Sequence, residues 1–487
     1  MGLAGPEIKW SDPMPIPARG RSETEIAAAL DGAAARDMNW RAGGTFAYTY
    51  HGGDDVERVA KDAYMRFLTE NGLDPTAYPS LVKFENDLIE MARAHLSGDE
   101  NVVGNFTSGG TESCLLAVKT ARDFARAARP EIREPEVILP ATAHAAFHKA
   151  CHYFCVKPII VPVDTKTFAA TPGAIADAIS PRTIQIVASA VSYAHGIMDP
   201  IPEIAALAKS RSLLFHVDSC IGGFQLPFWR KLGRNVPPFD FSVPGVTSMS
   251  MDFHKYAYCP KGASILLHRN KDLRRHQIFA GSNWTGYSIV NTTIQSSKSG
   301  GPLAAAWAVI NYLGEEGYLR LARKTIEATD TILEGLRSIP GVEILGAPAM
   351  SLLAFASRKA NPFALIEEMR SAGWFLQPQL AFMGSPENIH LTIRHDNLEN
   401  AGAMIAALRT AVAKLEGAPP LVPEGVLAQA RALKGEDFTP DLFKAMMREA
   451  DVSGGGAAAN VLLNAMAPRV RELVLIEFAN RLYTPRL

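Results

Sequence analysis

Short apolar runs alternate with amphipathic stretches through the middle of the chain. Six of these runs are typical of buried strands: EVILP (136–140), KPIIVPV (157–163), TIQIVASA (183–190), LLFHVDS (213–219), VTSMSM (246–251) and SILLHR (264–269). Stretches with helical periodicity, such as IPEIAALAKSRS (201–212), lie between them. The alternation predicts an α/β fold with a mostly parallel sheet covered by helices on both faces. In such sheets a ligand binds beyond the carboxyl ends of the strands.

The regions on either side of this alternation have different patterns. Residues 1–55 are rich in Gly, Pro and Trp and contain one clear helical pattern, which predicts an N-terminal arm lying on a larger body. Helices at 303–312 and 318–336 are followed by VEILG, SLLAFAS and NIHLTIR, three predicted strands that alternate with helices. We therefore predict a large domain at 56–315 and a smaller α+β domain at 316–487. The tail is expected to contain the loop SGGGAAAN (453–460) and a final helix.

The composition and charge of the chain argue against a nucleic-acid-binding, membrane-spanning or secreted protein. The 487 residues are 47% hydrophobic and carry a formal net charge of −1. There is no basic excess to attract nucleic acid or an anionic membrane. No window approaches the run of about 18 apolar residues that a membrane span needs, and MGLAGPEIKW lacks the basic and apolar regions of a signal peptide. We predict a soluble, cytoplasmic protein.

Metal and disulfide chemistry receive no support from the sequence. The five cysteines are odd in number and form no CxxC pair, so we expect reduced structural thiols. His144 and His148 have an i,i+4 spacing, but no HExxH motif accompanies them. We predict no metal site.

A Gly-rich turn precedes the amphipathic stretch that begins near residue 110. The sequence NFTSGGTESCLLAVKTARD (105–123) places Gly110 and Thr111 at the start of a predicted helix. Free backbone N–H groups and the positive end of the helix dipole at such a turn favour a phosphate group. The plainer interpretation is an ordinary helix cap, because many helices begin with Gly and Thr.

Two further polar residues follow predicted strands. His144 comes after EVILP at the start of a helix, where a histidine commonly caps the helix or fills the core, but its ring could also stack on a flat cofactor. Asp218 ends the run LLFHVD, so the strand carries a carboxylate to the edge of the sheet. A buried carboxylate needs a cationic or hydrogen-bonding partner. Such a partner could be a protonated ring nitrogen, or Asp218 could simply cap a helix.

Lys255 follows the predicted strand 246–251 in SMSMDFHKYAYCPKGA. A partly desolvated lysine can lose its proton and form a Schiff base, whereas the plainer alternative is an exposed lysine in a turn. Lys261 lies six positions later in a Pro-Gly turn and suits recognition of an anionic group. The phosphate cup, stacking histidine, aspartate and lysine together indicate a pyridoxal 5'-phosphate site.

Five stretches carry a resemblance to a known family: GNFTSGGTES, TAHAAFHKA, HVDSCIGGF, FDFSVPGVTSMSMDFHKYAYCPKGAS and GEEGY. They are similar to the pyridoxal-phosphate-dependent sphingosine-1-phosphate lyases, within the wider group of pyridoxal-dependent decarboxylases. The resemblance implies the aspartate-aminotransferase type of fold (fold type I), with a seven-stranded-type, mostly parallel sheet. It also implies a homodimer with shared active sites. The chain resembles the soluble bacterial members rather than the membrane-anchored eukaryotic ones.

The resemblance implies roles for the residues around the cofactor. Lys255 would hold pyridoxal phosphate, and His254 would contact its phosphate together with Gly110 and Thr111. His144 would stack on the ring, and Asp218 would bind the ring nitrogen.

It also implies roles around the substrate. Tyr50 would lie near the substrate, with Tyr48 as an alternative register, and Tyr193 would lie near the cofactor. Lys261 would belong to the substrate-phosphate pocket. Ser296 or Ser297, in SSKSGGP, would reach the cofactor phosphate of the partner subunit.

Three positions depart from the family pattern or stand outside it. Asp74 occupies the place of a histidine that helps to bind the substrate phosphate, and a carboxylate there would repel a phosphate. Lys298 replaces an arginine. Arg394, in HLTIRHDN, is either an exposed cation at a strand end or a group that binds a substrate carboxylate.

The resemblance implies retro-aldol cleavage of a phosphorylated sphingoid base to a long-chain aldehyde and phosphoethanolamine. An amino-acid decarboxylase on the same scaffold is the first alternative, because the bond that breaks depends on its alignment with the cofactor ring. Asp74 and Arg394 favour this alternative, whereas Lys261 favours the lyase. The second alternative is a non-catalytic binding protein that retains the fold.

Overall fold

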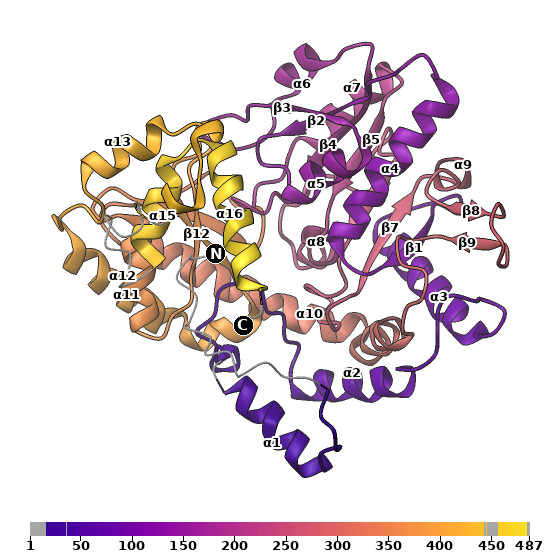
Figure 1. The fold of residues 1–487 in the computed structure, drawn as a ribbon, viewed down its shortest axis with the longest axis horizontal. Helices are drawn as coiled ribbons and strands as arrows, with labels where there is room; N and C mark the ends of the chain where they lie inside the picture. Colours follow the sequence, from indigo (N-terminus) through magenta and orange to yellow (C-terminus); the bar gives the residue numbers. More distant parts are fainter. Residues whose placement is uncertain (1–15, 36, 443–444, 446–455, 485–487) are drawn as a thin grey trace.

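The computed structural model describes residues 16–35, 37–442, 445 and 456–484 (Figure 1). Its largest element is a seven-stranded sheet in the order β1-β7-β6-β5-β4-β2-β3. The strands are β1 (Val103–Thr107), β2 (Glu136–Pro140), β3 (Lys157–Val161), β4 (Thr183–Ser189), β5 (Leu214–Asp218), β6 (Ser248–Met251) and β7 (Ser264–His268). Only β7 runs against its neighbours within this sheet. The predicted α/β fold with a mostly parallel sheet is confirmed.

Alternate side chains of the strands enter two different cores. Val137 and Leu139 of β2 pack with α4 (Gly110–Ala128) and α5 (Ala145–Phe154). Ile138 belongs to the opposite core, to which α3 (Pro79–His95), α6 (Pro172–Ala178), α7 (Ile201–Ser210) and α8 (Gly222–Lys231) also contribute. This period of two explains why the strands are continuously apolar in sequence.

A long helix, α10 (Gly301–Arg337), links the two parts of the chain. The sequence predicts two helices here, and the structure joins them across a kink at Gly314, where φ is 57°. The first half of α10 packs in the core of the large sheet, and the second half packs in the core of a smaller sheet. The predicted domain boundary at 315/316 lies beside the kink and stays a prediction.

The smaller sheet is antiparallel, with strand order β10-β11-β13-β12. Its strands are β10 (Val342–Ile344), β11 (Leu352–Ser357), β12 (Gln377–Gln379) and β13 (Asn388–Thr392), and α11 (Pro362–Ser371) and α12 (Ala401–Leu415) cover it. The N-terminal segment joins this part, because Thr45 bridges Phe375 and the buried ring of Phe46 packs in the same core.

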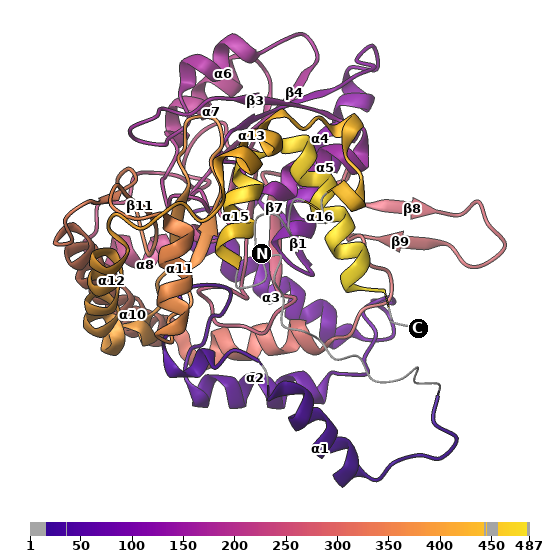
Figure 2. The ribbon, with the colours of Figure 1, turned by 60° about the vertical axis from the view of Figure 1, so that its left-hand side comes forward.

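The remaining helices are shorter or lie at the edges. They are α1 (Glu23–Ala34), α2 (Asp54–Arg66), α9 (Lys271–Arg274) and the 3-10 turns η1 (Trp40–Ala42), η2 (His395–Asn400) and η3 (Gly435–Asp437). A hairpin of β8 (Phe279–Gly281) and β9 (Ile289–Asn291), which the sequence pattern did not predict, projects from the body (Figure 2). No helix among the described residues is long and apolar enough to cross a membrane.

The C-terminal tail forms a helical unit, which we define as residues 422–482 so far as they are described. Its helices α13 (Glu424–Ala432), α15 (Gly456–Ala465) and α16 (Pro468–Leu482) share a small apolar core. The predicted final helix is confirmed. The predicted loop at 453–460 is wrong from Gly456 onward, because α15 begins there, and residues 453–455 lie outside the described residues.

Gly196 lies where the loop after β4 of the large sheet packs closely against β11 of the smaller sheet. Gly196 has φ +70°, and a Cβ added to it would lie 1.9 Å from the carbonyl oxygen of Leu352 in β11. We expect Gly196→Ala to lower Tm by roughly 2–5 °C, because the backbone must move and the conformation is strained for any other residue. Gly173→Ala is the control, since nothing lies within 4 Å of its added Cβ. Equal Tm values for the two variants would contradict the expectation.

Candidate active site

A cavity of about 340 Å³ lies beyond the carboxyl ends of β1, β2, β4, β5 and β6. Each strand contributes residues that follow its last position. The lining residues are Ser108–Glu112, Cys114, His144, Val191, Tyr193, Asp218, Cys220, Ile221, Asp252, His254 and Lys255. The structure therefore brings together Gly110, Thr111, His144, Tyr193, Asp218, His254 and Lys255, all of which the sequence selected.

The N-terminus of α4 forms one wall of this cavity. Gly109 is the N-cap residue with φ +149°, and a Cβ on Gly110 would lie 2.6 Å from Oδ2 of Asp252. Only glycine fits this close approach. The first N–H groups of a helix have no partner within it and attract anions. The His254 side chain lies beside this turn, 3.5 Å from the Cβ that Gly109 lacks.

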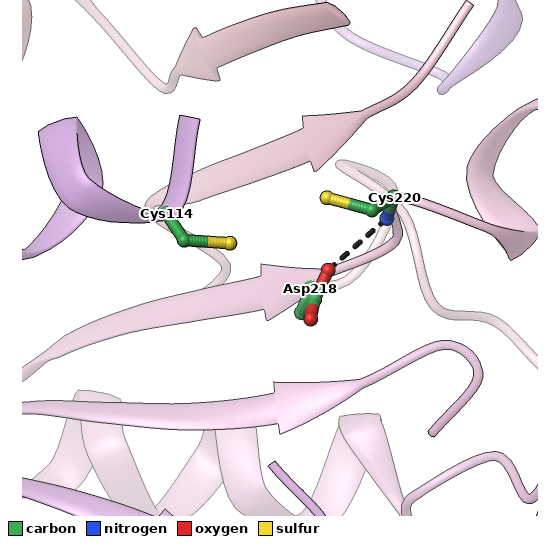
Figure 3. A group of neighbouring side chains, drawn as sticks. All are labelled: Cys114, Asp218 and Cys220. Atoms are coloured by element: carbon green, nitrogen blue, oxygen red, sulfur yellow. Dashed lines mark hydrogen bonds between the residues drawn. The ribbon is translucent and has the colours of Figure 1, made fainter. Parts of the chain in front are cut away.

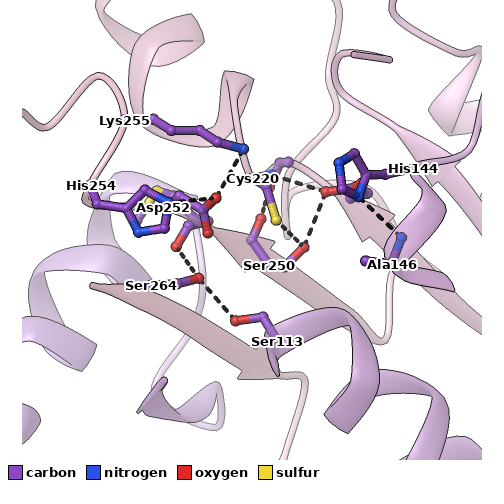
Figure 4. A network of polar contacts seen from close by, with 12 residues as sticks. Ser113, His144, Ala146, Cys220, Ser250, Asp252, His254, Lys255 and Ser264 are labelled. Carbon is purple, nitrogen blue, oxygen red and sulfur yellow. Dashed lines mark hydrogen bonds and ion pairs between the residues drawn. The ribbon is translucent and has the colours of Figure 1, made fainter. Parts of the chain in front are cut away.

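Lys255 is the only lysine among the described residues that line the cavity. Its Nζ lies 2.9 Å from Oδ2 of Asp252, which is almost completely buried (Figure 4). Burial alone would lower the pKa of Lys255, but the Asp252 carboxylate raises it above its usual value. The expectation that desolvation frees Lys255 of its proton is therefore wrong for this state of the chain, because the ion pair outweighs burial.

Asp218 ends β5, as predicted. Its Oδ1 accepts hydrogen bonds from the N–H of Cys220 at 3.1 Å and from the hydroxyl of Ser250 at 3.3 Å. The thiols of Cys114 and Cys220 point toward each other beside this carboxylate (Figure 3). Contact between the two thiols together with burial raises the pKa of Cys220 well above its usual value. These cysteines are reduced thiols, as the sequence predicts.

His144 is both an N-cap and a cavity residue. Its Nδ1 accepts a hydrogen bond from the N–H of Ala146 at 3.2 Å, so Nε2 carries the hydrogen of the neutral ring. Burial lowers the pKa of His144 and keeps it neutral. Tyr193 meets it edge-on, with ring centroids 6.2 Å apart, and donates a hydrogen bond from its hydroxyl to Gln377 at 2.5 Å.

Tyr50 and Lys261 lie together beside the cavity. The Lys261 ammonium lies 4.9 Å from the centre of the Tyr50 ring and donates to the carbonyl of His254 at 3.3 Å. Desolvation and the nearby Lys255 lower the pKa of Lys261 to about 8. Burial raises the pKa of Tyr50. Tyr48 is half-exposed and packs on Phe375, and the choice of Tyr50 over Tyr48 stays a prediction.

A second cavity, of about 1110 Å³, shares Ser108 and Glu112 with the first. Asp74, Lys261, Ser297 and Lys298 all line it. Ser296 lines neither cavity.

The Asp74 carboxylate is already engaged within its own turn. It is exposed and accepts hydrogen bonds from the N–H and hydroxyl of Thr76 at 2.8 and 2.6 Å. These bonds lower the pKa of Asp74, so it faces the cavity as an anion.

Arg394 requires a correction. The exposed cation expected at this strand end is 1% exposed. Its guanidinium makes two 2.8 Å bonds to the carboxylate of Asp396 and donates to the carbonyl and hydroxyl of Thr49. These partners occupy four of its five N–H donors, so the geometry gives no support to a substrate-carboxylate site. Arg394 instead fixes the segment that leads to Tyr50.

Sequence reasoning missed Asp252 and Glu112. Asp252 follows the last residue of β6, and the same strand-end rule that selected Asp218 would have found it. Glu112 accepts from the N–H of Ser108 at 2.6 Å and from that of Ile294 at 2.7 Å, which ties the phosphate cup to the segment that follows β9. Nothing in the sequence pattern indicates that long-range contact.

Comparisons with known proteins agree with this geometry. A family model described as the pyridoxal-dependent decarboxylase conserved domain matches residues 37–358. The sphingosine-1-phosphate lyase of Arabidopsis thaliana is 39% identical over 419 residues, which are 84% of this chain and 76% of that protein. The chain belongs to the sphingosine-1-phosphate lyase family.

Other relatives extend the comparison. A probable sphingosine-1-phosphate lyase of Legionella pneumophila is 34% identical, over 75% of this chain and 61% of that protein. The solved sphingosine-1-phosphate lyase of Burkholderia pseudomallei matches with a TM-score of 0.80 and 32% identity, over 84% of this chain and 95% of that one. Glutamate decarboxylase of Lactobacillus brevis, at 20% identity and a TM-score of 0.72, shares the fold.

These findings confirm the fold type I architecture, the cofactor pyridoxal 5'-phosphate and the class of PLP-dependent lyase. The non-catalytic alternative is therefore not retained. A second family model, described as the C-terminal putative HTH domain of pyridoxal-dependent enzymes, matches residues 424–481.

The lyase cavity fits its cofactor on the geometry of this chain alone. Nδ1 of His254 and Oδ1 of Asp252 are buried and have no hydrogen-bond partner in the part of the chain that the structure describes. The bare backbone at Gly109 and Gly110 leaves room for a phosphate at the end of α4. Such buried unpaired atoms are costly unless a ligand satisfies them.

The Asp252–Lys255 ion pair predicts how the lyase takes up its cofactor. A Schiff base requires the neutral amine, and Asp252 raises the pKa of Lys255. In Asp252→Asn the largest contribution that raises this pKa is lost, and burial, which lowers it, is opposed only by the smaller contributions of Cys220 and Tyr50. We expect the variant, mixed with excess pyridoxal phosphate, to bind it faster at neutral pH. The rate of cofactor binding should rise with pH and reach its plateau at a lower pH in the variant than in the wild type.

The measurement is the absorbance of bound cofactor, followed after mixing from about pH 6.5 to about pH 9.5, the range in which a perturbed lysine titrates. Asp164→Asn is the matched control, since Asp164 is an exposed acid that caps a remote turn. Superimposable pH profiles for Asp252→Asn and the wild type would show that the ion pair does not govern the lysine.

Proposed function

We propose that the chain cleaves a phosphorylated sphingoid base in retro-aldol fashion, giving a long-chain aldehyde and phosphoethanolamine. The observation that carries the proposal is the convergence of Lys255, Asp218 and His144 in one cavity of a sphingosine-1-phosphate lyase family member. Bound pyridoxal phosphate supplies the electron sink for the pair released when the Cα–Cβ bond breaks. The residues of the chain bind, orient and move protons.

In this proposal Lys255 holds the cofactor and accepts or returns a proton at Nζ. Asp218 holds the proton on the ring nitrogen, because a fixed carboxylate beside that nitrogen raises its affinity for a proton. His144 packs on the ring face in its neutral form. Gly110, Thr111 and His254 bind the cofactor phosphate at the end of α4.

The substrate phosphate is assigned to Lys261, which lines the larger cavity and donates to the carbonyl of His254, a residue of the smaller one. An incoming phosphate favours the ammonium and offsets the desolvation that lowers its pKa. Tyr50 keeps its phenolic proton because burial raises its pKa, so it can donate that proton near the carbon that loses the aldehyde. Asp74 stands on the wall of the same large cavity, where a cation such as Lys298 can screen it.

The decarboxylase alternative loses one of its two supports. Arg394 is engaged by Asp396 and Thr49, so it does not offer a free guanidinium to an amino-acid carboxylate. Asp74 remains as the observation that favours a substrate without a phosphate. Product analysis separates the two reactions.

We also propose a homodimer whose subunits meet through the projecting β8–β9 hairpin. Residues 277–297 contain no charged residue. The hairpin exposes Phe279, Trp284, Tyr287 and Val290, each more than half exposed. An uncharged, aromatic protrusion that continues into Ser296 and Ser297 suits contact with a second copy. The cytoplasmic location stays a prediction from the sequence.

Product analysis tests the reaction. The protein loaded with pyridoxal phosphate is given phosphorylated and unphosphorylated sphingoid bases and, separately, amino acids, and aldehyde and CO2 are measured. We expect aldehyde from the phosphorylated base. Lys261→Met should lower kcat/KM for that substrate by about 10–100-fold, because a charge-assisted contact is lost, and should affect the unphosphorylated base much less.

Lys209→Met, an exposed lysine on α7, is the control and should behave as the wild type. Lys255→Ala should abolish aldehyde release. Release of CO2 from an amino acid, with no aldehyde from either base, would replace the lyase assignment by the decarboxylase.

The hairpin proposal has its own measurement. We expect the double variant Trp284→Ser, Tyr287→Ser to shift the molar mass measured by light scattering toward the monomer, because two aromatic contacts are lost. Tyr153→Ser removes an exposed aromatic from α5 and should leave the mass unchanged. A double variant that dimerises like the wild type at every concentration would place the interface elsewhere.

A further inference from the structure

The segment around β12 is bound to the loop that carries Tyr193. Gln377 Oε1 accepts the hydrogen bond from the Tyr193 hydroxyl at 2.5 Å. Two residues further on, Gln379 Nε2 donates to the carbonyl of Ala194 at 2.7 Å. Because side chains alternate along a strand, both glutamines face the loop of the large sheet. The position of Tyr193 therefore depends on β12.

A third contact lies at the end of the same segment. His195 Nε2 and the hydroxyl of Ser385 are 3.0 Å apart, and the His195 ring stacks on Phe168 with centroids 4.4 Å apart. Three consecutive residues of the loop after β4 are thus held by the segment 377–385.

The other side of this segment is held by the C-terminal helical unit. Leu380 packs against the apolar core of the unit. The N–H of Ala381 donates to Oδ1 of Asn464 at 2.7 Å, and its carbonyl accepts from Nη1 of Arg471 at 3.2 Å. Both backbone polar groups of Ala381 are therefore bound by α15 and α16.

Arg471 acts here as a geometric link. Its Nε donates to the carbonyl of Met466 at 2.9 Å and its Nη2 donates to the carbonyl of Asn464 at 2.7 Å, so main-chain oxygens receive its donors. Burial lowers the pKa of Arg471. The unit is anchored in turn on α11, where the N–H of Gly456 donates to Glu367 at 3.1 Å.

We propose that the C-terminal helical unit is an intramolecular clamp that fixes Tyr193 at the cofactor cavity, with Asn464 and Arg471 as positioning residues. The clamp acts through the segment 377–381. Tyr193 is stacked on His390 at 4.4 Å and meets His144 edge-on, so loss of its bond to β12 changes the face of the cavity that His144 forms. The inference concerns the cavity and holds for whichever amine the enzyme cleaves.

The charge of the C-terminal helical unit does not indicate binding to nucleic acid. The range 424–481, matched by the putative HTH model, contains eight acidic and seven basic residues. A nucleic-acid surface needs a basic excess to neutralise phosphates. The contacts of α15 and α16 with the segment 377–381 give the unit a structural role within the chain.

A double-mutant cycle tests the clamp. Arg471→Met should lower kcat/KM by about tenfold in the wild-type background, as expected for coupled neighbours. It should cause no further loss in the Tyr193→Phe background, because that variant already lacks the hydroxyl held by Gln377. Arg469→Met is the matched control on the same helix, where the guanidinium pairs with the exposed Glu472. Losses that add in the double variant would overturn the proposal.

Hydrogen exchange supplies a readout that needs no substrate. Arg471→Met should speed exchange in peptides covering 190–196 and 377–390 and leave β4 and β5 unchanged. Asn464→Ala breaks the same contact from α15 and should reproduce the pattern if Arg471→Met fails to fold. If exchange becomes faster only within residues 456–482 in both variants, the unit does not hold Tyr193. This outcome would contradict the clamp but leave the proposed lyase reaction untouched.

Discussion

The parallel direction of the strands determines where the active-site residues of this molecule lie. Six strands of the large sheet point the same way and only β7 is reversed, so their carboxyl ends meet at one edge. Polar residues that directly follow an apolar strand are thereby collected in one place although the sequence separates them by up to about 145 positions. Ser108, His144 and Asp252 follow three different strands and Asp218 ends a fourth, and all four residues line the same cavity.

Charge inside that cavity is balanced at close range. Asp252 is buried and pairs with Lys255, whose side chain is 19% exposed. The carboxylate would be costly to bury alone, since an unpaired buried charge costs several kcal/mol. Oδ1 of Asp252 and Nδ1 of His254 are buried and have no hydrogen-bond partner among the described residues. Buried polar atoms are normally hydrogen-bonded, so these two atoms indicate a binding site for a polar ligand. The same ion pair holds the lysine as an ammonium until the ligand arrives.

Sequence alone predicted the central elements because their burial is strong on both faces. The six apolar runs became β2 to β7, and the strand-end rule placed Asp218 and Lys255 correctly beside the cavity. Strand β1 was missed because Gly104 and Asn105 interrupt its apolar pattern. Strand β12 was missed because Gln-Pro-Gln carries no apolar alternation, and pairing with β13 alone makes it a strand. The exposure of Arg394 was predicted wrongly because one of its partners, Thr49, lies 345 positions away in the sequence. No local sequence pattern indicates such a contact.

The large sheet builds the cavity, but the smaller sheet positions Tyr193 in its wall and Tyr256 near it. The hydroxyl of Tyr256, which packs edge-on with Tyr50, donates to the carbonyl of Ile393 at 2.8 Å. Tyr193 is bound to β12 through Gln377, as described. A rotation of the smaller sheet would therefore act directly on Tyr193 and Tyr256, whereas Asp218 ends β5 and Lys255 follows β6 of the large sheet. It follows that changes in the smaller sheet or the helices docked on it can alter substrate choice without altering the cofactor's anchors.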